Sequence, residues 1–276
     1  MNVYLISHLG LGDNLYMIGA TLYLLQYYNT IYFVCKKKYY ENVKLFFKGN
    51  ENIIIVPADR IAEHEDNVQK ILTGDVYKNN DVILCGSLKN NFRTKITNKK
   101  LLNRIKQKNR YTIDHDTLTS SNYYFIESFY KDINLELNIF YDHFYLPSFK
   151  QSQNYYNMLS DYKNIIFIHS KSSSNVLNFD QVFQINCGKC DTIMICANYN
   201  VYESTKKLSK LQYKKYEICK KLVNIPLVYY KTIIQKCQEI YITDSCFTGI
   251  VLPYLKTNKL KAKIVRIIRR QNGIEL

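Results

Sequence analysis

The sequence predicts an α/β protein made of two Rossmann-like domains. Short β-branched runs alternate with longer helical patterns, which is typical of parallel sheets covered by helices on both faces. This alternation weakens after residue 85 and resumes after residue 150. The length of 276 residues also suits two domains at the usual size of about 100–200 residues each.

The N-terminal half is expected to form a parallel sheet followed by a less regular segment. Its apolar runs of strand length lie at residues 3–7, 31–35, 52–56 and 81–85. Its helical patterns cover residues 15–28, 39–47, 61–72 and 123–131. A polar and basic stretch occupies residues 90–110, and an irregular one follows at 111–121.

The polar segment that begins at Pro147 is the best candidate for a domain boundary, which gives domains 1–147 and 148–276. After it, strands are expected at residues 164–169, 192–197, 239–243 and 263–268, with a further apolar run at 225–229. Helices are expected at residues 155–159, 204–222 and 247–255. No internal repeat interrupts this second half.

The chain is basic, with 38 Lys and Arg against 23 Asp and Glu. Residues 1–149 hold 18 basic and 15 acidic side chains, whereas residues 150–276 hold 20 basic and 8 acidic ones. Such a surplus indicates an anionic partner, namely a nucleotide diphosphate, a nucleic acid or an acidic membrane surface. The alternative is that the lysines only solvate helix faces.

Membrane-spanning and disulfide-rich classes are excluded by the sequence. No run approaches about 18 apolar residues, and the first residues lack a basic region of a signal peptide. The eight cysteines include one C-x-x-C pair, Cys187 and Cys190, whereas a zinc ribbon needs a second pair. We expect reduced thiols and a cytoplasmic protein, in the host cytoplasm if the source is viral.

The loop after the first strand, Ser7-His8-Leu9-Gly10-Leu11-Gly12-Asp13-Asn14, lies where open parallel sheets bind ligands. It is a poor dinucleotide motif, because Leu15 replaces the third glycine. Asp13 has two interpretations, either a helix cap or a general base that removes a proton from an acceptor hydroxyl.

Two loops of the C-terminal half also follow expected strands. His169-Ser170-Lys171-Ser172-Ser173 offers a cation and many hydrogen-bond donors, which suits a diphosphate, although a solvated turn explains the same residues. Thr243-Asp244-Ser245 precedes a helix, so its side chains can cap that helix or bind sugar hydroxyls.

These three loops, with the segment 124–147, resemble the GT-B glycosyltransferases, in particular the heptosyltransferase-like family and its relatives in bacteria and large DNA viruses. The resemblance implies two Rossmann-like domains facing across a cleft. It also implies an inverting, metal-independent transfer from a nucleotide-sugar to a hydroxyl of a glycan or glycoconjugate, with no cofactor. The N-terminal domain would bind the acceptor and the C-terminal domain the donor.

The resemblance also implies roles for single residues. Asp13 would be the catalytic base, with His8, Gly10, Gly12 and Asn14 in the acceptor loop. The donor would contact His169, Ser170, Lys171, Ser172, Ser173, Ala197, Asn198, Tyr199, Asp244 and Ser245. The chain departs from the family at Cys246-Phe247-Thr248, which replaces a small, glycine-rich run.

Two other functions remain open at this point. Asp114 and Asp116 form a D-x-D pair of the kind that holds a metal and a diphosphate in GT-A glycosyltransferases. The net charge and 26 tyrosines also suit a basic nucleic-acid-binding α/β protein. However, the sequence contains no known motif for binding nucleic acids, so a nucleic acid is not the expected partner. The lysine-rich helix at 204–222 is a candidate for weak contact with an anionic membrane.

Overall fold

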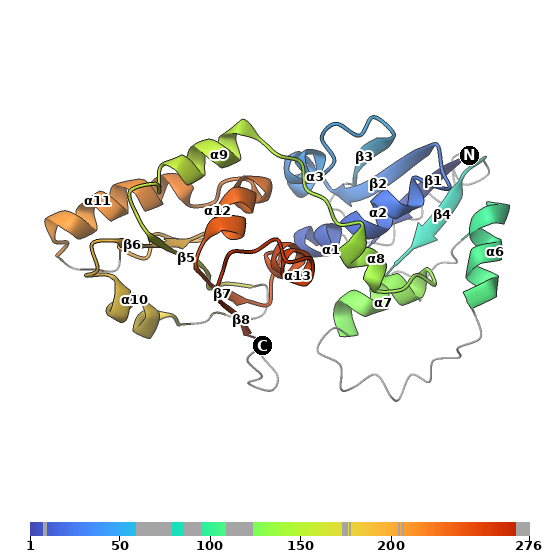
Figure 1. Cartoon of the computed structure of the whole chain (residues 1–276). Coiled ribbons are helices and arrows are strands. Elements are labelled where there is room, and N and C mark those ends of the chain that lie inside the picture. The colour runs from blue at the N-terminus through green and yellow to red at the C-terminus, as the bar shows by residue number, and fades with distance from the viewer. Residues whose placement is uncertain are drawn as a thin grey trace. The chain divides into compact units, whose positions relative to one another are not determined.

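The computed structural model describes residues 1–7, 10–58, 79–85, 95–108, 124–172, 176, 178–203, 205 and 207–268. The chain divides into two compact units, Met1–Pro147 (unit 1) and Ser148–Leu276 (unit 2). Each unit contains a four-stranded sheet of parallel strands with helices (Figure 1). The predicted α/β class with two parallel sheets is therefore confirmed.

Unit 1 is built on a sheet in the order β3-β2-β1-β4. Its strands are β1 (Asn2–Ile6), β2 (Thr30–Lys36), β3 (Ile53–Ala58) and β4 (Asp81–Leu84). Its described helices are α1 (Leu11–Tyr16), α2 (Ile18–Leu24), α3 (Tyr40–Phe46), α6 (Lys99–Lys108), α7 (Tyr124–Asp132) and α8 (Asn138–Asp142). The four predicted strands of this half are confirmed, and the predicted helix at 61–72 lies outside the described residues.

The single helix predicted at residues 15–28 is instead two helices, α1 and α2, that meet at Met17. Tyr130 of α7 is fully buried beside this junction. Its hydroxyl donates a hydrogen bond to the carbonyl of Tyr16 (2.7 Å) and accepts one from the amide of Ala20 (3.2 Å). The junction is thus stabilised by a tyrosine more than a hundred positions away, which a pattern of local periodicity does not reveal.

Gly19 explains how α2 packs on α8. A Cβ atom at this position would lie 2.7–2.8 Å from backbone atoms of Ile139 and Phe140. Real Cβ contacts are longer, so only glycine lets the two helices approach this closely.

Unit 2 has the strand order β6-β5-β7-β8. Its strands are β5 (Asn164–His169), β6 (Thr192–Cys196), β7 (Glu239–Thr243) and β8 (Ile264–Ile268). Its described helices are α9 (Lys150–Asn157), α10 (Asp180–Asn186), α11 (Lys210–Cys219), α12 (Lys231–Lys236) and α13 (Thr248–Lys256), with a short 3-10 helix at Leu227–Tyr230. The predicted strands are confirmed within one residue, whereas α10 and α12 were not predicted.

The lysine-rich helix differs from its prediction in length and in burial. It begins at Lys210, because Ser209 caps it: the Ser209 hydroxyl accepts from the amide of Gln212 (3.3 Å), and the Gln212 side chain accepts from the amide of Ser209 (3.0 Å). Lys215 is fully buried, and its ammonium donates to the carbonyls of Cys187 and Lys189. This lysine therefore ties α11 to the end of α10, which lies on the opposite side of the sheet in Figure 1.

Candidate functional site

The order of strands in unit 2 marks a place where a ligand can bind. The chain runs from β5 to β6 on one side and then returns to place β7 on the other side of β5. In open parallel sheets, ligands bind outside the carboxyl ends of the strands at such a switch point. Here β5 ends at His169 and β7 ends at Thr243, so two of the predicted loops flank the switch point.

His169 links these two loops. Its Nδ1 atom lies 2.9 Å from the hydroxyl of Ser245, across the switch point. The imidazole is 8% exposed, and its centroid lies 4.7 Å from that of the Phe247 ring. Burial lowers the pKa of His169 from 6.5 to about 4, so the ring is neutral at pH 7.

Asn198, after β6, is hydrogen-bonded to the predicted loop that follows β5. Its Oδ1 atom accepts a hydrogen bond from the amide of Ser170 (3.1 Å), and its Nδ2 atom donates to the Ser170 hydroxyl (3.1 Å). The thiol of Cys196 also donates to Oδ1 (3.2 Å). The structure therefore brings together residues from the ends of β5, β6 and β7.

The other residues predicted to bind the donor differ in their exposure and in their contacts. Lys171 is exposed and pairs with Val176 in an antiparallel bridge. Ser172 and Asp244 are half-buried, whereas Ser173 lies outside the described residues. The carbonyl of Ala197 is already engaged, because it accepts from the amide of Asn224 and the hydroxyl of Tyr230.

Tyr199 follows Asn198 directly in the chain after β6. It is 37% exposed, and partial burial raises the pKa of its phenol. An exposed ring at the end of a strand can stack on a planar group such as a nucleotide base, and the role of residues 197–199 stays a prediction.

Phe247 explains how the chain tolerates its departure from the glycine-rich run of the family it resembles. The ring is 2% exposed and packs against Phe167 (5.1 Å between centroids) and Tyr230 (5.3 Å). It therefore fills the core beneath His169. Sequence reasoning missed this contact, because the direction of a side chain in a turn depends on the turn's hydrogen bonds.

The corresponding loop of unit 1 contains a short-range hydrogen bond at the start of α1. Gly10 precedes α1, and its amide donates to Oδ2 of Asp13 (2.9 Å), so Asp13 helps to cap the helix that contains it. A Cβ atom at position 10 would collide with this carboxylate. Gly12 and Asp13 are half-buried, and His8 lies outside the described residues.

Two buried oxygen atoms beside this loop lack a hydrogen-bond partner among the described residues. They are Oγ of Ser7 and Oδ1 of Asn14, whose residues are 1% and 0% exposed. The Nδ2 atom of Asn14 donates to the carbonyl of Gly10 (2.8 Å). Within the described part of the loop, these two atoms at the carboxyl end of β1 thus have unused hydrogen-bonding capacity.

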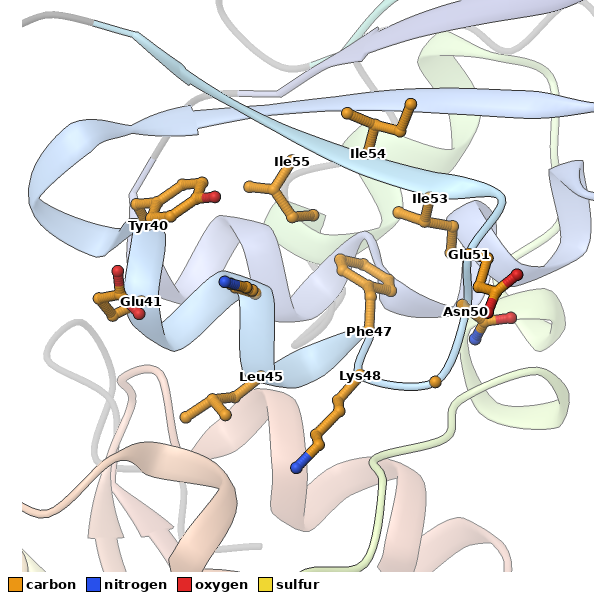
Figure 2. Close-up of a pocket in the computed structure, with 12 residues that line it drawn as sticks. Tyr40, Glu41, Leu45, Phe47, Lys48, Asn50, Glu51, Ile53, Ile54 and Ile55 are labelled. Atoms are coloured by element: carbon orange, nitrogen blue, oxygen red, sulfur yellow. The ribbon is translucent and has the colours of Figure 1, made fainter.

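A surface cavity of about 700 Å³ lies elsewhere in unit 1, between α3 and the start of β3. Figure 2 shows Tyr40 and Phe47 beside Ile53 and Ile55, with Lys48 at the side. The cavity involves the amino-terminal part of β3, whereas the predicted loops follow the carboxyl ends of strands. None of the predicted site residues lines it.

The described residues offer no cluster for a metal. No group of three or more His, Cys, Asp or Glu side chains occurs among them, and all eight cysteines are free thiols. Cys187 is half-buried and Cys190 is exposed. The D-x-D pair, Asp114 and Asp116, lies outside the described residues.

No protein-family model and no curated protein matches the sequence. Among solved structures, the chain is similar to a glycosyl transferase family 9 protein from Veillonella parvula DSM 2008, with a TM-score of 0.49 and 11% identity over 98% of this chain and 86% of that one. It is also similar to the E. coli heptosyltransferase WaaC with ADP, with a TM-score of 0.45 and 10% identity over 99% and 92% of the two chains. Likeness at this level assigns neither a family nor an activity to the chain.

Proposed function

We propose that the protein is a glycosyltransferase that moves a sugar from a nucleotide-sugar donor to a hydroxyl of a glycan or glycoconjugate. The observation that carries this proposal is the network at the β5–β7 switch point, where His169, Ser170, Asn198 and Ser245 are held together. The network lies in the half of the chain with 20 basic and 8 acidic residues. Donors and positive charge at the edge of a parallel sheet favour a diphosphate.

The same edge supplies each part of a donor site. The exposed ammonium of Lys171 provides positive charge for the leaving diphosphate, with Ser172 beside it and Ser173 next in the chain. The amino end of α13 adds the favourable field of a helix dipole. Tyr199 is placed to stack on the base, and Asp244 is suited to accept hydrogen bonds from sugar hydroxyls.

Asp13 is the proposed general base for the acceptor hydroxyl, and the transfer is then inverting. A base must be held in a fixed orientation near the proton that it removes. The amide of Gly10 gives the Asp13 carboxylate such a fixed orientation. In this proposal unit 1 binds the acceptor and unit 2 binds the donor in a GT-B arrangement, with basic groups in place of a metal at the leaving group.

Burial of the aromatic side chains argues against the alternative of nucleic-acid binding. Nine of the 26 tyrosines are buried in the described core. Those that are exposed within the described ranges are Tyr145, Tyr199 and Tyr213. A stacking surface for single-stranded nucleic acid needs several exposed rings along one groove.

A weak contact with an anionic membrane surface remains part of the proposal, in a cytoplasmic protein. Lys210, Lys220 and Lys221 are exposed on or beside α11. Within the described ranges, no helix combines the length and the apolar character needed to cross a bilayer. Contact made through these lysines would be electrostatic and would weaken with salt.

The test is a thermal-shift screen of the whole chain with UDP, GDP, CMP, dTDP, ADP and NAD, each with and without Mn²⁺, and with a single-stranded oligonucleotide. A ligand that binds the native state raises the melting temperature by mass action. Stabilisation by one nucleoside diphosphate without metal is the expected result. Stabilisation that requires Mn²⁺ would transfer the proposal to Asp114 and Asp116. A response only to a single-stranded oligonucleotide, lost at high salt, would overturn the enzyme proposal.

A further inference from the structure

We propose that Ser245 is a positioning residue that fixes one tautomer of His169. The Ser245 hydroxyl donates its proton to Nδ1, so that the neutral imidazole carries its own proton on Nε2 and donates it to a diphosphate oxygen of the donor. This inference rests on the proposed function and goes further, because it assigns a charge state and a direction to a hydrogen bond in the donor site.

The turn between β7 and α13 holds Ser245 in place. Its amide donates to the hydroxyl of Thr248 (3.1 Å), and its own Oγ atom accepts from the amide of Phe247 (3.3 Å). A hydroxyl oxygen has two acceptor sites and one proton. The Phe247 amide occupies one of these acceptor sites, and Nδ1 of His169 lies 2.9 Å from the same oxygen, so donation of the hydroxyl proton to Nδ1 is compatible with both contacts.

His169 has little freedom to turn away from this contact. It is the last residue of β5 and is paired with Ile242 of β7. The Phe247 ring packs on its imidazole, and the side chain is 8% exposed. Its other ring nitrogen, Nε2, has no hydrogen-bond partner among the described residues, so it remains for a ligand.

Burial also sets the charge of the ring. It is the only cause that moves the pKa of His169, which falls to about 4. A neutral imidazole has one N–H group, so a ring that accepts at Nδ1 must donate at Nε2. Titratable groups on the elements around the ring are those of Lys171, Cys196, Tyr230, Tyr241, Asp244 and Cys246.

A neutral N–H donor on His169 complements the positive charge that Lys171 provides in the loop after β5. Lys171 supplies the charge that offsets the diphosphate, and it is exposed, so it keeps its hydration in the free protein. A second charge on the buried ring would carry a large desolvation cost. An oriented N–H group gives directional binding without that cost, as preorganised donors do in other active sites.

The first test compares two amides at position 169. In His169→Gln the amide nitrogen reaches the place of Nε2, whereas in His169→Asn it reaches the place of Nδ1. Calorimetric titration with the nucleoside diphosphate found in the screen is expected to give an affinity within about threefold of wild type for Gln and at least about tenfold weaker for Asn, since a hydrogen bond to a charged group is lost. Equal affinities for the two variants would overturn the proposal.

The second test observes the tautomer directly. In the ¹⁵N NMR spectrum of the free protein, the His169 signals, assigned by their loss in His169→Gln, are expected to show an unprotonated Nδ1 and a protonated Nε2. Ser245→Ala is expected to mix the tautomers and weaken nucleotide binding, and Ser245→Thr is expected to restore both properties. A protonated Nδ1 in the wild type would overturn the inference while leaving the proposed function intact. The expected tautomer in a protein that binds no nucleoside diphosphate would overturn the role of Nε2 together with the proposed function.

Discussion

The carboxyl edges of the two sheets are organised differently. In unit 1, Asp13 and Asn14 form hydrogen bonds with Gly10, which lies three and four positions away. In unit 2 the contacts join residues far apart, because His169 and Ser245 are 76 positions apart and Ser170 and Asn198 are 28 apart. Local contacts shape a helix start, whereas long-range contacts form only when strands are correctly ordered.

Under the proposed function, this difference suits a donor site in unit 2 whose side chains are already held in place. The edge of unit 2 has its side chains bonded across three strands before any ligand binds. The edge of unit 1 retains Ser7 Oγ and Asn14 Oδ1 without a partner in the part of the chain that is described. We expect donor binding to depend on unit 2 and the chemical step to depend on unit 1.

Removal of the Asp13 carboxylate gives the largest expected effect. Asp13→Ala should lower sugar transfer by about 10²–10⁴-fold, the usual contribution of a general base, and leave nucleotide affinity unchanged. Transfer would be followed with the sugar derivative of the nucleotide found in the screen. The matched control is Asp142→Asn, which removes an exposed carboxylate of the same unit. It should leave both sugar transfer and nucleotide affinity at wild-type levels. Transfer that survives in Asp13→Ala would remove the functional contrast between the units.

Acid should destabilise the protein through His169. Its pKa falls from 6.5 to about 4 on folding, so between these values the unfolded chain binds a proton that the folded chain does not. Stability is therefore unaffected by this group above pH 6.5 and is lost as the pH falls toward 4, by about 2–3 kcal/mol at 1.4 kcal/mol per pH unit. Urea unfolding at pH 7.5 and 4.5 checks this, with His169→Gln as reference. The same acid sensitivity in both proteins would show that the ring is not buried and neutral.

Lys171 should control donor affinity. Lys171→Ala is expected to weaken nucleoside diphosphate binding about tenfold, the cost of losing one charge-assisted contact. Lys163→Ala is the matched control, because it removes the same charge from an exposed lysine before β5, at the opposite end of that strand. Equal losses in the two variants would mean that net charge, and not the loop at the end of β5, attracts the nucleotide.

A methyl group at position 10 should have the smallest effect of the four. Gly10→Ala places a Cβ against the Asp13 carboxylate and should disturb its bond to the amide of residue 10. We expect transfer to fall about threefold to tenfold, the net value of one hydrogen bond, with donor affinity unchanged. Gly188→Ala, where a Cβ meets nothing within 4 Å, should leave both properties at wild-type levels. An unchanged transfer rate in Gly10→Ala would show that the hydrogen bond between the Gly10 amide and Asp13 is not needed for the proposed reaction.

The strands could be predicted from sequence because buried β-branched runs such as Ile165–Ile168 are distinct from their surroundings. The short helices α10 and α12 could not, since six or seven residues give too little periodicity to detect. The helix predicted at 204–222 is longer than the observed helix, Lys210–Cys219, because the spacing of leucines continues across the cap at Ser209. A buried lysine such as Lys215 is invisible to any rule that places lysines in solvent.

The loops of the candidate site could be located, but their internal contacts could not be predicted. A polar segment after a strand indicates an edge of the sheet, which is enough to single out His169, Asn198 and Ser245. Their pairing requires the order β6-β5-β7, and a single sequence does not fix the order of parallel strands. The burial of the Phe247 side chain beneath His169 could not be predicted from the sequence either.

The central claim is that a nucleoside diphosphate binds at the β5–β7 switch point of unit 2. A crystal structure of the whole chain with the nucleotide found in the screen tests it most directly. We predict a diphosphate oxygen within hydrogen-bonding distance of Nε2 of His169, about 2.7–3.2 Å, with Lys171 directed toward the phosphates. A nucleotide bound elsewhere, for example in the cavity between α3 and β3, with the His169–Ser245 pair unliganded, would contradict it.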